Sequence, residues 1–199
     1  MARGQYADAE PLFEECATLA RTLADAHLLA VILGNLGIVV RARGDRERAA
    51  ALSAEALRLA REVGDRVLTS EALSYMGRAE CRDGNLQPAA ACIVESLRIA
   101  GDLADPNAAA EALEGFAELA VAKRDPTRAA TTLGAAARLR EAIGFPTPPH
   151  EERELERVAA AARAALGDAA FDRAWREGSA MDLEDAVRYA LNDRAAGNP

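Results

Sequence analysis

The sequence predicts an all-α fold in which antiparallel helix pairs stack into an α-solenoid. Three observations support this prediction. The chain is rich in Ala, Leu, Glu and Arg, which favour helix, and it contains no run of alternating β-branched residues that would indicate a strand. Apolar residues recur at helical spacing. A skeleton of small and apolar residues returns every 40 residues, which is typical of a helical repeat array.

Four segments of the chain share the repeated skeleton. They read GQYADAEPLFEECA from Gly4, GDRERAAALSAEAL from Gly44, GNLQPAAACIVESL from Gly84 and RDPTRAATTLGAAA from Arg124. Each unit holds two stretches of helical periodicity separated by a short turn, so each unit predicts one helix pair. The helices expected from the repeats cover residues 7–23, 27–42, 45–63, 67–82, 86–101, 107–122 and 126–142.

The first of these helices, 7–23, contains Pro11. Because a proline inside a helix removes a backbone hydrogen bond, we expect this helix to begin near Asp8 or to be kinked at Pro11. In the frame of the repeat it is a second helix whose partner would precede Met1. The sequence therefore predicts that this helix is unpaired and that the chain is the end of a longer array.

The next six helices pair as 27–42 with 45–63, 67–82 with 86–101, and 107–122 with 126–142. Gly44, Gly64 and Gly84 interrupt the periodicity, and glycine suits the left-handed residue that follows a helix end. Gly37 and Gly77 are expected where the two backbones of a pair approach most closely, because a larger side chain there would force the helices apart.

The segment GFPTPPH, from Gly144 to His150, ends the periodicity, because three prolines in four residues cannot continue a helix. Three more helices are expected near residues 150–166, 168–177 and 182–193, with Asp182 as the N-cap of the last. The sequence therefore predicts three parts, which are a repeat array over residues 1–142, a proline-rich connector over 143–149 and a C-terminal helical cap over 150–199.

The helix pairs resemble the tetratricopeptide repeat. The signature of that family places Leu-Gly on the first helix, and Ala followed four residues later by a bulky residue on the second. Here Leu36 and Gly37 precede Ala49, and Gly77 precedes Ala89 and Ile93. The chain lacks the Trp and Tyr of the signature, and its period is longer than the 34 residues of the family.

The C-terminal part has a narrower resemblance. Residues Arg128 to Leu191, with AFDRAWREG and LEDAVRYAL as their most specific segments, are similar to the closing segment of large bacterial signal-transduction ATPases. Those proteins join an ATPase module to a tetratricopeptide-like array, and many carry a DNA-binding or cyclase module. The resemblance implies a cytoplasmic bacterial signalling protein or transcriptional regulator. The sequence contains no Gly-rich loop ending in Gly-Lys-Ser or Gly-Lys-Thr.

Composition and motifs argue against several functions. The net charge of −8 disfavours direct binding to nucleic acid, and no apolar run is long enough for a membrane span. Cys16, Cys81 and Cys92 lack metal-ligand spacing and are interpreted as reduced core thiols of a cytoplasmic protein with no secretory leader. His27 and His150 have no partner at ligand spacing. We therefore predict no catalytic residue, no metal and no cofactor.

The acidic run Glu151, Glu152, Glu154 and Glu156 is interpreted as a solvated helix face rather than as a metal or catalytic site.

The resemblance to tetratricopeptide arrays implies a concave groove lined by the first helix of each pair. The predicted partner-binding residues in this groove are Asn35, Ile38, Arg41, Glu71, Tyr75, Arg78, Arg82, Glu111, Glu114 and Glu118. The last three follow helical spacing and predict an acidic stripe, with ordinary solvated surface as the alternative.

The leading hypothesis is a non-enzymatic protein-interaction and regulatory module. It would bind a protein segment, a peptide or another domain of a larger parent protein in the groove. The sequence is also compatible with a homo-oligomer. The alternative is a small-molecule effector sensor that holds its ligand between the array and the cap. Phe171 and Trp175, four residues apart, would form an aromatic ligand box in that case, and otherwise cover the open end of the last repeat.

Overall fold

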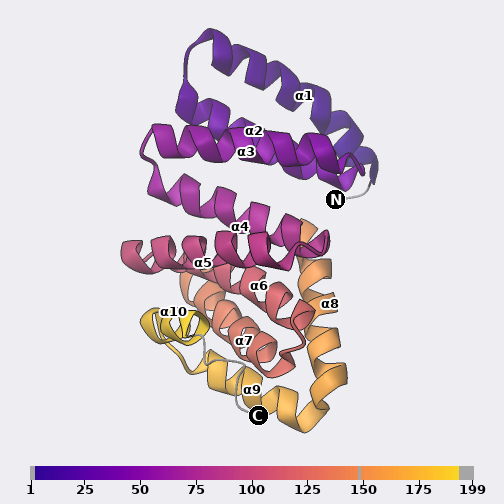
Figure 1. The fold of residues 1–199 in the computed structure, drawn as a ribbon, viewed down its shortest axis with the longest axis vertical. Coiled ribbons are helices and arrows are strands. Elements are labelled where there is room, and N and C mark those ends of the chain that lie inside the picture. The colour runs from indigo at the N-terminus through magenta and orange to yellow at the C-terminus, as the bar shows by residue number, and fades with distance from the viewer. Residues whose placement is uncertain (1–2, 148, 193–199) are drawn as a thin grey trace. The chain divides into compact units, whose positions relative to one another are not determined.

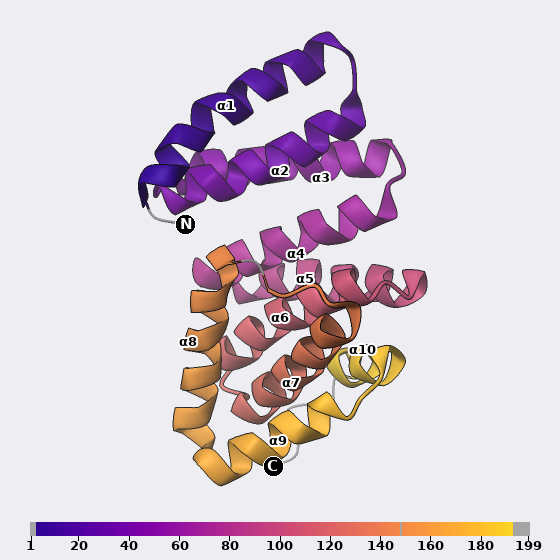
Figure 2. The ribbon, with the colours of Figure 1, turned by 180° about the vertical axis from the view of Figure 1, so that it is seen from behind.

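The computed structural model describes the backbone of residues 3–147 and 149–192, and the side chains of residues 8–147 and 151–192. Within these residues the chain forms ten α-helices and no strand, which confirms the all-α class (Figures 1 and 2). The helices are α1 (Arg3–Thr22), α2 (Ala26–Ala42), α3 (Arg46–Glu62), α4 (Arg66–Arg82), α5 (Leu86–Leu103), α6 (Pro106–Ala122), α7 (Pro126–Ile143), α8 (Pro149–Leu166), α9 (Asp168–Ser179) and α10 (Leu183–Leu191).

The turns between the helices of the array follow one pattern. In each of the first six turns a residue with positive φ is followed by Asp or Asn. Asp25, Asp45, Asp65, Asp105 and Asp125 each accept a hydrogen bond from a backbone N–H in the first turn of the next helix. The residue with positive φ ends one helix and the carboxylate caps the next, so a short turn suffices to reverse the chain.

The helix α1 differs from its prediction. It begins at Arg3 and not near Asp8, and Pro11 lies inside it. A proline removes only one backbone N–H from the helix, and the remaining hydrogen bonds hold the turns on either side of it. The expected start near Asp8 is therefore wrong, and the alternative, a kink at Pro11, stays a prediction.

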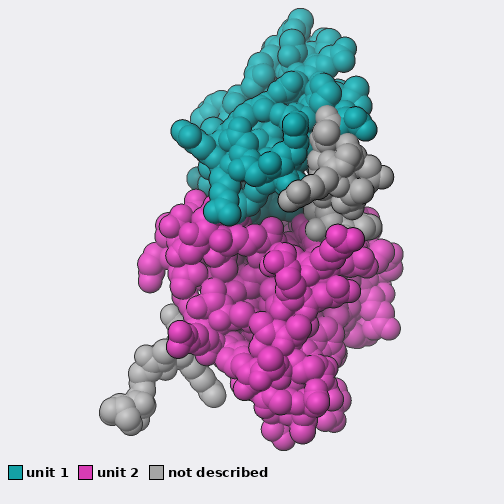
Figure 3. Space-filling model, turned by 90° about the vertical axis from the view of Figure 1, so that its right-hand side faces the viewer, with its two compact units in different colours: residues 1–76 teal, residues 77–199 magenta. Residues whose placement is uncertain are grey.

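The chain divides into two compact units, residues 1–76 and residues 77–199, which are coloured separately in Figure 3. We refer to them as unit 1 and unit 2. The division falls inside α4. The division of the chain into three parts around the proline-rich connector, residues 143–149, stays a prediction.

In unit 1, α1, α2 and α3 pack in sequence order around a core of small and aliphatic side chains. The backbones of α2 and α3 approach closely at Gly37, where an added Cβ would lie 3.0 Å from the hydroxyl oxygen of Ser53. The buried cluster shared by all three helices consists of Ala17, Ala20, Leu29, Ala30, Ile32, Leu33, Ala56 and Leu59.

In unit 2, α5, α6 and α7 continue the array, and the last three helices cover it. The helix α8 packs against α6, α7 and α9, while α10 packs on α5, α6 and α7. Figures 1 and 2 show α8 and α10 on opposite sides of α6 and α7.

The helices α7 and α9 touch along their backbones. A Cβ added to Gly178 would lie 1.8 Å from the carbonyl oxygen of Thr131, and one added to Gly134 would lie 2.2 Å from that of Trp175. The hydroxyl of Ser179 also donates a hydrogen bond of 3.2 Å to the Gly134 carbonyl. Only residues without a side chain permit this approach, so Gly134 and Gly178 determine where α9 docks.

Candidate protein-binding surfaces

The groove positions of unit 2 form a buried ion network rather than an open surface. The Nε of Arg78 donates to Glu118 Oε1 at 2.6 Å, and its Nη1 donates to Glu151 Oε2 at 2.7 Å. The three side chains are only 3%, 4% and 6% exposed. Because Glu151 belongs to the first turn of α8, the helix α8 occupies the face where a partner segment was expected.

Arg82 adds a second cation to this network. Its Nη2 donates to Glu118 Oε1 at 2.9 Å and its Nε donates to Glu118 Oε2 at 3.1 Å. Both carboxylate oxygens of Glu118 are therefore bonded to guanidinium groups. The planar fork of arginine suits this arrangement, and it satisfies an acid that burial would otherwise destabilise.

Glu114, one turn before Glu118, is paired in the same way. Arg140 of α7 donates to its two oxygens at 2.9 Å and 3.1 Å and to Oδ1 of Asn107 at 2.9 Å. Glu111 lies at the edge of this pair, with its Oε1 4.0 Å from Nη2 of Arg140.

The electrostatics of the network follow from burial and pairing. Burial by itself would lower the pKa of Arg78, but the carboxylates of Glu118 and Glu151 hold that pKa above its ordinary value. Burial opposes the charge of Arg140 in the same way, and the hydrogen bonds that it donates to Glu114 raise its pKa. Both arginines therefore stay charged at every accessible pH, and the negative charges of their partners are neutralised inside the protein.

The expectation of an open acidic stripe is therefore wrong for Glu114 and Glu118, and the interpretation of Glu151 as solvated is wrong as well. Glu114, Glu118 and Glu151 are 2%, 5% and 5% exposed. The physical reason is that α8 excludes water from this face, so each acid needs an internal cation. One signal in the sequence could have indicated part of this result. Arg78 and Glu118 are 40 residues apart, so two adjacent first helices carry opposite charges at one repeat position.

The groove positions of unit 1 are more accessible. Asn35 is exposed, and its side-chain amide donates a hydrogen bond of 2.9 Å to the Val31 carbonyl of the preceding turn. Ile38 and Arg41 on α2, and Glu71 and Tyr75 on α4, are half-buried. In unit 2 the structure brings the predicted groove residues together, and there it encloses all of them but the exposed Arg82 and the half-buried Glu111.

Sequence reasoning missed an exposed apolar surface of unit 1. Leu12, Leu19 and Leu23 are 63%, 56% and 72% exposed, and Cys16 between them is also exposed. Their spacing places all four on one face of α1 and the turn that follows it. We call this set of four residues the α1 row. The prediction that Cys16 is a core thiol is wrong, because the face it occupies has no helix over it among the described residues of unit 1.

The equivalent positions of the next repeat show how such a row is buried when other helices pack on it. Ala56 and Leu59 occupy the repeat positions that correspond to Cys16 and Leu19, forty residues later in the chain. Both are buried, at 2% and 7% exposure, and they belong to the core that α3 shares with α1 and α2. The α1 row is thus the face with which a second helix packs on the preceding helices of an array. Combining the repeat frame with the expectation that the first helix is the second member of a repeat pair would have predicted it.

The described residues offer little support for catalysis. Burial, and then the carboxylate of Glu118, raise the pKa of the Cys81 thiol to about 11, so this thiol is protonated and weakly nucleophilic near neutral pH. His27 Nε2 lies 3.0 Å from Asp65 Oδ2, and the side chain of His150 lies outside the described residues. In the same part of the chain, no group of three or more His, Cys, Asp or Glu side chains is arranged to hold a metal ion.

Among residues 3–147 and 149–192, no helix combines the length and the apolar character that a membrane span requires.

Comparisons with known proteins agree with this architecture. A family model described as tetratricopeptide repeat matches residues 1–62. The crystal structure of BtubC (BKLC) from P. vanneervenii is similar, with a TM-score of 0.63 and 19% sequence identity over 98% of this chain and 78% of that chain. No curated protein matches the sequence. At this identity the likeness to BtubC shows the fold alone.

The fold is thus a tetratricopeptide-like α-solenoid, and the match to the tetratricopeptide family covers residues 1–62. Tetratricopeptide repeats generally act as non-enzymatic scaffolds that mediate interactions between proteins.

Proposed function

We propose that this chain is a non-enzymatic protein-interaction module that binds an amphipathic helix of a partner protein along the α1 row. The observation that carries the proposal is the contrast between repeats. Leu19 is 56% exposed, whereas Leu59 and Leu139, at the same repeat position, are each 7% exposed. Exposed large apolar side chains that cluster on one helix face are typical of interaction sites.

The packing of α3 supports a helix as the occupant. Ala56 and Leu59 of α3 pack in one core with aliphatic side chains of α2 and small side chains of α1. A partner helix presenting Leu, Ile and Ala at helical spacing would cover the α1 row in the same manner.

The charges beside the α1 row suggest further chemistry of the partner. Asp8 and Glu15 are exposed and lie three or four residues from Leu12, so they border the row on the face of α1. A partner helix with Lys or Arg beside its apolar face would complement these two acids. Association should then weaken as salt is added, since exposed charges are screened.

We restrict the predicted partner-binding groove to residues of unit 1. The enclosed arginines and acids of unit 2 are not offered as a binding surface, because α8 occupies that face. Asn35, Ile38 and Arg41 on α2 stay candidates for contacts with an extended segment of the same partner. The resemblance of residues 128–191 to the end of bacterial signalling ATPases supports a role within a cytoplasmic signalling or transcriptional regulator.

A display library of amphipathic helical peptides tests the proposal. Peptides that bind the full chain would be selected, and their affinities would then be measured for Leu19→Asp and for a matched control, Val63→Asp. Val63 is 41% exposed and lies in unit 1 outside the α1 row. We expect Leu19→Asp to weaken binding by at least about tenfold, and Val63→Asp to leave it unchanged.

Two outcomes would overturn this proposal. Selected peptides that bind Leu19→Asp as tightly as the wild-type chain would exclude the α1 row. Sedimentation that shows a wild-type dimer and a monomeric Leu19→Asp variant would assign the row to a second copy of this chain instead.

A further inference from the structure

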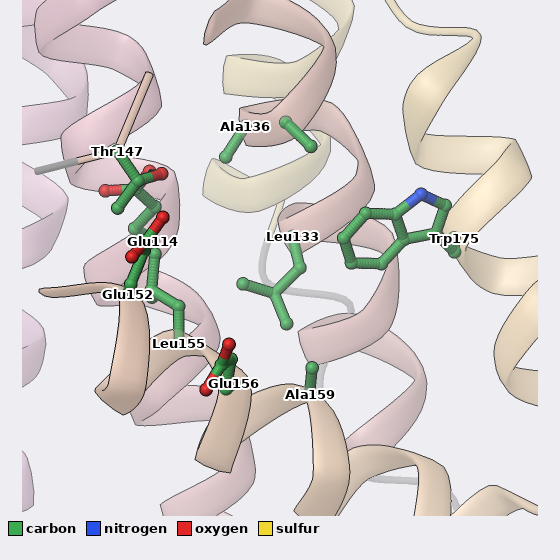
Figure 4. A pocket seen from close by; sticks show the side chains of 10 residues that line it. Glu114, Leu133, Ala136, Thr147, Glu152, Leu155, Glu156, Ala159 and Trp175 are labelled. Carbon is green, nitrogen blue, oxygen red and sulfur yellow. The ribbon is translucent and has the colours of Figure 1, made fainter. Parts of the chain in front are cut away.

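A cavity of about 240 Å³ lies in unit 2 where α6, α7, α8 and α9 meet (Figure 4). It is separate from the α1 row, and of its lining only Glu114 also belongs to the buried ion network described above. Its lining is apolar except at one end. The residues that line it are Glu114, Leu133, Ala136, Ala137, Thr147, Glu152, Leu155, Glu156, Ala159 and Trp175.

Small side chains open the cavity and an aromatic ring closes its far end. Ala136, Ala137 and Ala159 stand where α7 and α8 face each other, and their short side chains leave the space between these helices unfilled. Figure 4 shows the indole of Trp175 next to Leu133 at the end opposite the acids. The ring of Phe171 stacks on Trp175 with centroids 5.8 Å apart, which fixes the indole in place.

The polar end of the cavity carries unbalanced negative charge. Glu152 and Glu156 lie one turn apart on α8 and are exposed. No hydrogen bond or ion pair to either carboxylate is found among the described residues. Glu114 differs from them, because Arg140 neutralises it, and the hydroxyl of Thr147 lies 3.4 Å from its Oε1. Two like charges four residues apart on a helix disfavour that helix, so a cation between them would stabilise α8.

We propose that this cavity binds a small organic cation, namely an amine or quaternary ammonium group on an apolar body of one or two rings. The body would lie between Leu133, Leu155 and Trp175, and the cationic group would lie at Glu152 and Glu156. The indole face also attracts cations, so both ends of the cavity favour positive charge. The volume is below the range of about 300–1,000 Å³ that is usual for drug-sized ligands, which limits the ligand to a small amine.

The charge of the cavity discriminates between ligand classes. A carboxylate or phosphate ligand would meet the two free acids at the opening and be repelled. A neutral alcohol of the same shape would gain the apolar contacts but no ionic contact. Amine, alcohol and acid forms of one body therefore bind in a fixed order if the proposal is correct.

The chain contains one tryptophan, so its fluorescence reports on this cavity directly. The full-length chain would be titrated to millimolar concentrations with 3-phenylpropylamine, 3-phenylpropanol and 3-phenylpropionate, while indole emission is recorded. We expect the amine to change the emission of Trp175 and to bind about tenfold more tightly than the alcohol, and the acid to bind weakest. Added salt should reduce the preference for the amine.

Two sets of variants locate the site. Glu152→Gln with Glu156→Gln should weaken binding of the amine by about tenfold and leave binding of the alcohol unchanged. Ala159→Leu should fill the cavity and abolish binding of both. Its matched control is Ala160→Leu, which adds the same side chain at an exposed position of α8 and should leave binding intact.

The proposal would be overturned if the amine left the Trp175 emission unchanged up to millimolar concentration. It would also be overturned if 3-phenylpropionate bound as tightly as the amine, or if Ala160→Leu weakened binding as much as Ala159→Leu. Circular dichroism of each variant separates loss of binding from loss of the fold. Because the double Gln variant adds no volume, it tests the charge even if Ala159→Leu fails to fold.

Discussion

The helices α2 and α6 present the same repeat positions to different surroundings. Ile38 on α2 corresponds to Arg78 on α4 and to Glu118 on α6, each 40 residues from the last. Ile38 is half-buried in unit 1, whereas Arg78 and Glu118 are enclosed in unit 2 and paired with each other. The repeat frame therefore identifies equivalent positions, but the helices packed over a position decide whether it is a surface or part of the interior.

The helices α1 and α3 show the same contrast for apolar residues. Leu19 and Leu59 are chemically identical and occupy one repeat position, yet the first is exposed and the second is buried. In unit 1 an apolar face of α1 is exposed, while in unit 2 the helices α8, α9 and α10 cover α5, α6 and α7. Unit 2 thus resembles an array with a cap, and unit 1 resembles an array open to association.

The largest expected effect tests the buried network of unit 2. Glu118→Ala would remove the shared acid between Arg78 and Arg82 and leave buried positive charge with fewer partners. We expect the free energy of unfolding, measured with urea, to fall by about 3–5 kcal/mol. Glu152→Ala, at an exposed position of α8, should change it by less than about 0.5 kcal/mol. Equal effects of the two substitutions would mean that the network is solvated.

A second pair of substitutions compares α3 with α1. Leu59→Ala should lower the free energy of unfolding by about 2–5 kcal/mol, because it creates a cavity in the core of unit 1. Leu19→Ala, at the same repeat position, should change it by no more than about 0.5 kcal/mol, because the side chain is already in water. A large loss of stability for Leu19→Ala in the isolated chain would show that the α1 row is covered by the chain itself.

The smallest expected effects compare two glycines. Gly178→Ala would place a methyl group against the backbone of α7, and we expect it to destabilise the chain by about 1–3 kcal/mol. Gly34→Ala, inside α2, meets nothing within 4 Å and should stabilise the chain by about 0.5–1 kcal/mol. Thermal melting followed by circular dichroism would measure both, and a stabilising Gly178→Ala would contradict the close contact of α7 and α9.

Much of the fold could be predicted from the sequence because its signals are local. The periodicity of apolar residues and the breaks at Gly44, Gly64 and Gly84 placed the helix ends within a few residues, apart from the start of α1. The repeat frame also identified the close approach at Gly37 and Gly77. An added Cβ on Gly77 would lie 2.6 Å from the side chain of Ile93 on α5. Helix propensity, capping and turn residues act over a few positions, so one sequence is sufficient to recognise them.

The sequence by itself thus determined an all-α array with a 40-residue period, and it placed Arg78, Glu114 and Glu118 on one inner face. Only the tertiary structure decided that α8 covers that face. Glu151 and Glu152 are neighbours in one acidic run, yet the first is enclosed against Arg78 and the second is exposed. Arg78 and Glu151 are 73 residues apart in the chain, so no local pattern links them. Burial of a charge depends on which distant cation meets it when the helices pack, and that meeting is a property of the folded chain alone.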